Sequence, residues 1–130
     1  MIILDVETFY TNLIYHEKDL AIVFRYSRAN IYSYHALIGS LEINSKLNQI
    51  PIFVPTPDIF FSEIDRLLSI ESFSRIIIGL SIHTFQLQEN IEVIQQINQH
   101  PQRGKIIIIA GGPHPSARPE DLLKIGADFI

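Results

Sequence analysis

The sequence predicts an α/β fold: an open parallel sheet of about five strands with helices on both faces, in three layers. Short apolar runs alternate with amphipathic segments along most of the chain, and strands joined by helical crossovers pair in parallel through right-handed connections. One run, Ile106–Ala110, is unbroken and mostly β-branched. Such a run is typical of a strand buried on both faces of a parallel sheet.

The composition indicates one domain and excludes several kinds of site. A chain of 130 residues is long enough to bury a single core. Its net charge of -4, with scattered basic residues, argues against nucleic acid as a partner. Without cysteine it can hold no disulfide, thiolate zinc site, cysteine nucleophile or cysteine-ligated iron–sulfur cluster within these residues. No apolar run approaches the ~20 residues that span a bilayer, so we expect a soluble, cytoplasmic protein with no membrane partner.

Regular elements begin near residue 19. Residues 1–18 are predicted to form an amino-terminal arm or extra strand, followed by a domain at residues 19–130. The first core strand is the apolar run Leu20–Phe24. A helix follows, with Asn30 as its N-cap. Its apolar face recurs with a 3.6-residue period at Ile31, Tyr34, Leu37, Ile38, Leu41 and Leu47.

The next two strands are Ile50–Val54 and Ile76–Leu80, and a helix lies between them. We expect Thr56 to be the N-cap of that helix and Pro57 to be its first residue. Its buried stripe consists of Phe60, Ile64, Leu67 and Leu68. A further helix ends before Pro101 and buries Leu87, Ile91, Ile94 and Ile97.

The fourth strand, Ile106–Ala110, ends at two consecutive glycines. Pro119 then begins a last short helix, and Gly126 occupies the position of a left-handed C-cap. Residues 128–130 begin a fifth strand, which the end of the sequence truncates.

Ligands of such sheets bind beyond the carboxyl ends of the strands, where the strand order reverses. Four segments are predicted at this rim: Arg25–Arg28, Pro55–Pro57, Ser81–Thr84 and Gly111–Ser116. The glycines at 111 and 112 leave the backbone open to close approach by another molecule. Taken alone they favour the alternative, a tight turn by which the chain leaves the sheet.

Polar side chains at this rim are candidate ligand contacts. Pro113 is expected to stiffen a loop that presents His114, and His83 follows a neighbouring strand. Two histidines without a nearby carboxylate make a poor metal site, so no metal is predicted. The hydroxyls of Ser81 and Thr84 are candidate donors, with helix capping as the alternative for Thr84. Neither has an evident base, so no catalytic residue is predicted.

Two segments resemble the amino-terminal cobalamin-binding-like domain of radical S-adenosylmethionine proteins. They are Ile109–Ser116 and Pro119–Ile130, and Tyr32–Glu42 and Ile78–Ser81 fit more loosely. The resemblance covers residues 19–130. It implies a flavodoxin-like (Rossmann-like) fold, with cobalamin over the carboxyl ends of the strands and its nucleotide tail entering the domain.

The resemblance places Ser81, Gly111 and Gly112 beside that tail. Together with the rim residues, the predicted cofactor-binding set is Ser81, His83, Thr84, Gly111, Gly112, Pro113 and His114. No Asp-x-His-x-x-Gly motif follows the first strand, so the resemblance does not extend to the histidine that ligates cobalt in some relatives.

The resemblance also implies a partner. S-adenosylmethionine and a 4Fe–4S cluster would belong to a downstream radical S-adenosylmethionine domain, whose clustered cysteines are absent here. We therefore expect a carboxyl-terminally truncated, cobalamin-binding fragment that is non-catalytic by itself. The alternative is a ligand-free flavodoxin-like scaffold that serves interdomain or protein interaction.

Overall fold

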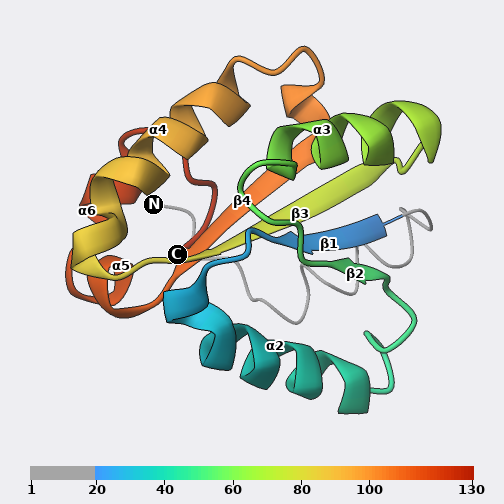
Figure 1. The fold of residues 1–130 in the computed structure, drawn as a ribbon, viewed down its shortest axis with the longest axis horizontal. Helices are drawn as coiled ribbons and strands as arrows, with labels where there is room; N and C mark the ends of the chain where they lie inside the picture. The colour runs from blue at the N-terminus through green and yellow to red at the C-terminus, as the bar shows by residue number, and fades with distance from the viewer. Residues whose placement is uncertain (1–19) are drawn as a thin grey trace.

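A computed structural model describes residues 20–130, and the arm predicted at residues 1–18 lies outside them. Four parallel strands form a central sheet in the spatial order β2-β1-β3-β4 (Figure 1). They are β1 (Leu20–Phe24), β2 (Ile52–Phe53), β3 (Arg75–Ser81) and β4 (Ile106–Gly111). This order is that of a flavodoxin-like sheet, so the predicted fold class is confirmed.

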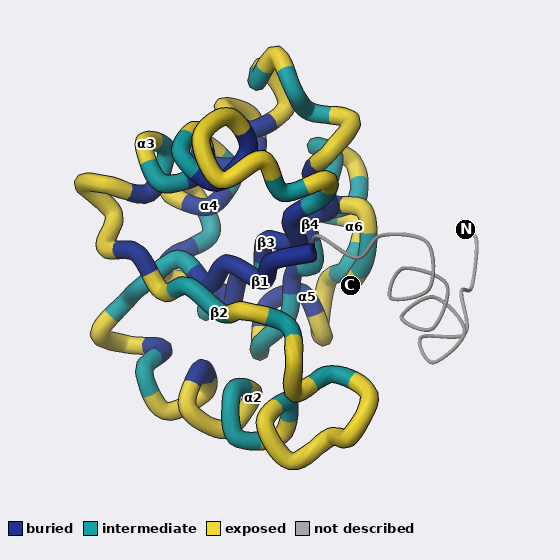
Figure 2. Tube along the Cα trace, turned by 90° about the vertical axis from the view of Figure 1, so that its right-hand side faces the viewer, coloured by how far each residue is buried: buried dark blue, intermediate teal, exposed yellow. Residues whose placement is uncertain are grey.

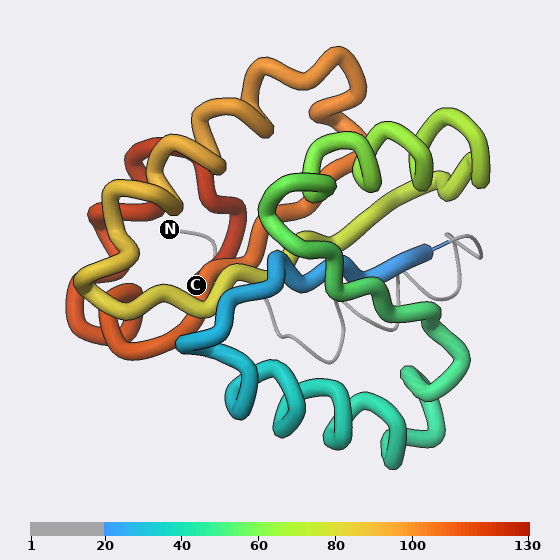
Figure 3. The backbone as a smooth tube through the Cα atoms, in the orientation of Figure 1, coloured from blue at the N-terminus to red at the C-terminus, as the bar shows by residue number. Residues whose placement is uncertain are grey.

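Helices cover both faces of the sheet and give the predicted three layers (Figures 1 and 3). One face carries α2 (Ile31–Ile43), which follows the 3₁₀ turn η1 (Arg28–Asn30). The other carries α3 (Phe60–Asp65) with its π-helical continuation η2 (Arg66–Ile70), α4 (Leu87–Asn98) and α6 (Glu120–Leu123). The remaining elements are η3 (Thr84–Gln86), η4 (Arg103–Lys105) and α5 (Pro113–Ala117). No helix in the described part of the chain is long and apolar enough to cross a bilayer.

Alternating side chains of the strands form two apolar clusters, one on each face. Ile76, Ile78 and Ile108 are fully buried on the face that α3, α4 and α6 cover. On the opposite face, Ile77 and Ile107 pack in one cluster with Tyr34 of α2. Within residues 20–130, α2 is the one helix on that face, and much of its surface is exposed (Figure 2). The two faces therefore differ in how thickly they are covered.

The predicted fifth strand is present as a single parallel bridge between Ile109 and Phe129 at the β4 edge. The backbone N–H of Ala110 donates to the carbonyl of Phe129 at 3.0 Å. Gly126 has a φ of 112°, the left-handed conformation that was predicted for the end of the last helix. A Cβ there would overlap the amide end of the Asn98 side chain, which would have to move, so the left-handed φ is the stronger reason for glycine at this position.

Of two predicted helix caps, one is confirmed in position and the other is wrong. Asn30 is the N-cap residue of α2, but its side chain makes no capping bond, and its Nδ2 donates to the carbonyl of Ser81 on β3 instead. Thr56 Oγ1 donates to Asp58 Oδ1, and α3 begins later, at Phe60. Each polar side chain has another partner, one from a distant strand and one from the local turn.

The connection from α2 to β2 is longer than predicted. Asn44 Oδ1 accepts the backbone N–H groups of Lys46 and Leu47 at 2.9 and 3.1 Å, and such side-chain bonds favour turns over helix. The helix therefore ends at Ile43, and Leu47 lies in the following turn. The strand predicted at residues 50–54 is reduced to the two residues of β2.

Candidate functional site

The chain leaves the sheet toward opposite faces after two neighbouring strands, β1 and β3. After β1 it enters α2 on one face, and after β3 it enters α4 on the other (Figure 3). A crevice forms at such a switch point, outside the carboxyl ends of the strands. The predicted segments Arg25–Arg28 and Ser81–Thr84 flank this point, and Gly111–Ser116 follows the adjacent strand β4.

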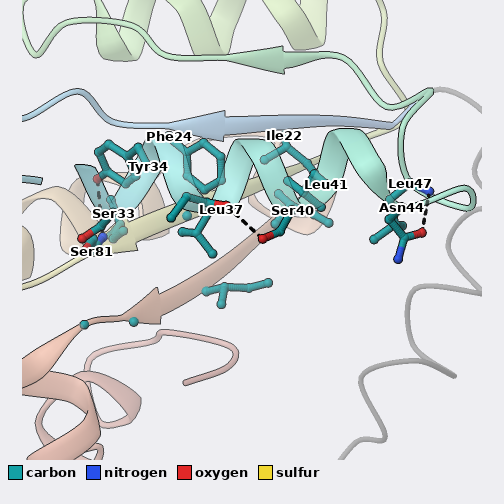
Figure 4. A pocket seen from close by; sticks show the side chains of 17 residues that line it. Ile22, Phe24, Ser33, Tyr34, Leu37, Ser40, Leu41, Asn44, Leu47 and Ser81 are labelled. Carbon is teal, nitrogen blue, oxygen red and sulfur yellow. Dashed lines mark hydrogen bonds between the residues drawn. The ribbon is translucent and has the colours of Figure 1, made fainter. Parts of the chain in front are cut away.

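A pocket of about 660 Å³ lies between α2 and its face of the sheet (Figure 4). Ile22, Ile77 and Ile109 line it from β1, β3 and β4. Leu37 and Leu41 line it from α2. The pocket is therefore mainly apolar along its length, and it extends to the carboxyl ends of β3 and β4.

Three of the predicted residues line the pocket at those strand ends: Ser81, Gly111 and Gly112. The sheet register pairs Ser81 with Gly111. A Cβ on Gly111 would meet no atom within 4 Å, so this glycine leaves free space at the strand end. Gly112 differs, because its φ is 102° and a Cβ would lie 2.8 Å from the backbone nitrogen of Ile82. The tight-turn alternative thus explains Gly112 but not Gly111.

Three hydrogen bonds join the segments after β1 and β3 across the switch point. The Ser81 N–H donates to the Tyr34 hydroxyl oxygen at 3.4 Å, and Asn30 Nδ2 donates to the Ser81 carbonyl. Gln86 Nε2 donates to Ser27 Oγ at 3.0 Å. Because Asn30, Tyr34 and Gln86 are buried, these bonds fix the position of α2 relative to the strand ends.

Tyr34 is a buried polar residue that lines the pocket. Burial raises the pKa of its hydroxyl above the ordinary 10.0, while hydrogen bonds from Ser81 and Asn30 and the charge of Arg25 lower it in part. The phenol is therefore protonated at neutral pH and able to donate. Its ring stacks on Phe24, with ring centroids 5.1 Å apart and an interplanar angle of 28°.

His114 is buried instead of being presented at the rim, because its segment forms the short helix α5 where a stiff loop was predicted. Thr84 Oγ1 lies 3.2 Å from its Nδ1, and Asp121 Oδ2 lies 2.8 Å from its Nε2. With the carboxylate as acceptor, Nε2 donates and Nδ1 accepts the Thr84 hydroxyl. The imidazole therefore joins α5, α6 and η3, and the Thr84 hydroxyl binds it and caps no helix.

His83 lies apart from this cluster, and its ring stacks on the exposed Phe85 with centroids 5.4 Å apart. The described residues that line the pocket do not include His83, Thr84, Pro113 or His114, and their contact with a cofactor stays a prediction. Within residues 20–130, no three histidine, aspartate or glutamate side chains form a group that could hold a metal ion.

A known protein family matches the part of the sequence that contains these strand ends. The family model described as B12 binding domain matches residues 47–130, which is more than half of the chain. This chain belongs to the B12 binding domain family. The ligand class of the B12-binding domain is thus cobalamin. The matched region contains the pocket residues Ser81, Gly111 and Gly112, whereas α2 lies before it in the sequence. No curated protein and no solved structure gave a match.

The sequence revealed the strand half of the pocket in this B12-binding domain, but not the helix half. Ser81 and Gly111 were predicted because each ends an apolar strand. Leu37 and Tyr34 follow the apolar period that is typical of helix core positions, and Asn30 has the residue type of an N-cap. No sequence signal marked these three as part of the site.

Replacing His114 by alanine is expected to lower the free energy of unfolding of the B12-binding domain by about 1–3 kcal/mol, because Asp121 and Thr84 lose a shared partner. Thr84→Val removes one neutral hydrogen bond and should cost less. Urea denaturation followed by circular dichroism measures both. His35→Ala, at an exposed position of α2, is the matched control, with an expected change below about 0.5 kcal/mol. Equal losses in H114A and H35A would contradict the bridging role of His114.

Proposed function

We propose that this domain binds cobalamin with its nucleotide tail in the pocket between α2 and the sheet, and presents the corrinoid to a radical S-adenosylmethionine catalytic domain. One observation carries the proposal: the pocket reaches Ser81, Gly111 and Gly112, the three positions that the resemblance places beside the tail. The bound corrinoid would supply cobalt chemistry, and the residues of this chain would hold and orient it.

The dimensions and lining of the pocket support a nucleotide-sized occupant. Its volume of about 660 Å³ falls within the roughly 300–1,000 Å³ of small-molecule sites. The isoleucine and leucine walls would bury a heterocyclic base, and the open space at Gly111 admits bulky ligand atoms. No histidine within residues 20–130 lines the pocket, so the proposal includes no cobalt ligand from this pocket.

The catalytic partner is inferred from the residues that resemble the radical S-adenosylmethionine family, chiefly Ile109–Ser116 and Pro119–Ile130. The 130 residues contain no cysteine, and cysteine thiolates are the ligands of a 4Fe–4S cluster. The cluster and the S-adenosylmethionine site would therefore belong to another part of the protein. The domain would be non-catalytic by itself.

A ligand-free scaffold for protein interaction is the second candidate, and the outer surface of α2 favours it. Tyr32 and Ile43, near the two ends of this helix, are 85% and 87% exposed, and a bound partner would cover such apolar side chains. A scaffold would use this outer surface, whereas a cobalamin domain would use the inner side of the same helix. Binding of cobalamin therefore separates the two candidates.

Hydroxocobalamin is expected to co-elute with the wild-type chain in gel filtration, and Gly111→Val should weaken its binding by roughly tenfold or more, because the valine side chain occupies the strand-end space. Valine suits a strand, and its Cβ would meet no atom within 4 Å, so the circular dichroism spectrum should not change.

Gly104→Val is the matched control, since Gly104 has equally open surroundings but lies in η4, before β4, at the amino ends of the strands. No co-elution with the wild-type chain at high micromolar concentration would favour the scaffold. Equal binding by G111V and G104V would contradict the assigned pocket.

The complete protein that carries this domain, isolated without oxygen, is expected to contain about four iron atoms per chain in a radical S-adenosylmethionine domain. Iron and sulfide analysis, with electron paramagnetic resonance of the reduced protein, measures this. A complete protein that binds hydroxocobalamin but contains no iron would overturn the catalytic partner and leave cobalamin binding intact.

A further inference from the structure

One buried hydroxyl at the strand end of the pocket has a proton without an acceptor. The Tyr34 oxygen accepts hydrogen bonds from the N–H of Ser81, at 3.4 Å, and from the Asn30 side chain, and these bonds leave the phenolic proton available. Oδ1 of Asn30 is buried and has no hydrogen-bond partner in the described part of the chain, so it does not take that proton. Because a buried donor without an acceptor is costly, a ligand atom that accepts this proton would stabilise the site.

The polar side chains at the far end of the pocket are occupied by local bonds. Ser40 Oγ donates to the carbonyl of Ala36 at 2.9 Å. Asn44 Oδ1 accepts the N–H groups of Lys46 and Leu47 in the turn that follows α2, and Figure 4 shows the bond with Leu47. An occupant of the inner, strand-end part of the pocket would therefore meet Tyr34 and Ser81, the two buried hydroxyl-bearing residues that line it, between aliphatic walls.

The space beside Tyr34 suits a flat heterocycle. The Tyr34 ring stacks on Phe24, and Phe24 in turn lies close against Gly79, where a Cβ would be 2.6 Å from the Phe24 ring. Ile77 and Ile109 line the pocket from the sheet. A volume of about 660 Å³ accommodates a base with its ribose, not a whole corrinoid.

We propose that Tyr34 recognises the nucleotide base of cobalamin by donating its hydroxyl proton to a ring nitrogen of that base. The inference rests on the proposed function and names the base as the part of the ligand that this residue selects. The dimethylbenzimidazole of cobalamin has one ring nitrogen that accepts a hydrogen bond when it is not bound to cobalt. The rest of the base is apolar, as are the pocket walls.

Cobinamide tests this assignment, because it keeps the cobalt and the macrocycle of cobalamin but lacks the nucleotide tail. Affinities of the 130-residue chain for hydroxocobalamin and for aquated cobinamide are measured by absorbance titration. The wild type should bind cobalamin more tightly. Tyr34→Phe keeps the stacked ring and should weaken cobalamin binding by roughly 3- to 10-fold, with no change for cobinamide.

Tyr32→Phe is the matched control, because Tyr32 lies on the same helix and is 85% exposed, and it should change neither affinity. Thermal unfolding of Y34F and Y32F shows whether the fold is retained. Equal wild-type affinity for the two corrinoids, or an equal effect of Y34F on both, would overturn the role of Tyr34 and leave cobalamin binding intact. Failure of the wild type to bind either corrinoid would overturn the proposed function and this inference with it.

Discussion

The in-register parallel pairing of β1, β3 and β4 is the constraint on which the rest of the structure depends. Ile76–Ser81 pairs residue by residue with Ile106–Gly111, so β3 and β4 end together and Ser81 lies beside Gly111. Because side chains alternate along a strand, a shift of one residue would turn the isoleucines of both clusters to the wrong faces. Burial of those isoleucines thus holds Ser81 and Gly111 side by side at the carboxyl ends of the strands.

The unequal cover of the two faces explains where the pocket lies. Three helices pack over the face that holds Ile78 and Ile108, whereas α2 is the one described helix on the other face. From α2, Tyr34 is buried, but Leu37 is 48% exposed although it lines the pocket. Apolar side chains on more than one side of a helix are typical of an element covered from several directions. A cofactor tail between α2 and the sheet would cover the apolar side chains of α2 that line the pocket.

Sequence reasoning located the strands well and the polar contacts poorly, for physical reasons. The run at β4, the period of α4 and the left-handed Gly126 are local properties, and local patterns predict them. The hydrogen-bond partners of Asn30 and His114 are tertiary contacts. The partner of Asn30 lies 51 residues away in the sequence, and no local sequence pattern indicates such a partner. The helix half of the pocket escaped prediction because pocket-lining and core leucines have the same helical period.

Chemical-shift mapping tests the central claim, that the corrinoid enters between α2 and the strand ends. ¹⁵N-labelled chain is titrated with hydroxocobalamin, and amide shifts are followed by NMR. The account predicts large shifts for Leu37, Ser81 and Gly111, and none for Glu71 and Arg103, which precede β3 and β4 at the amino ends of the strands. Shifts confined to those amino ends, or to the outer surface of α2, would contradict it.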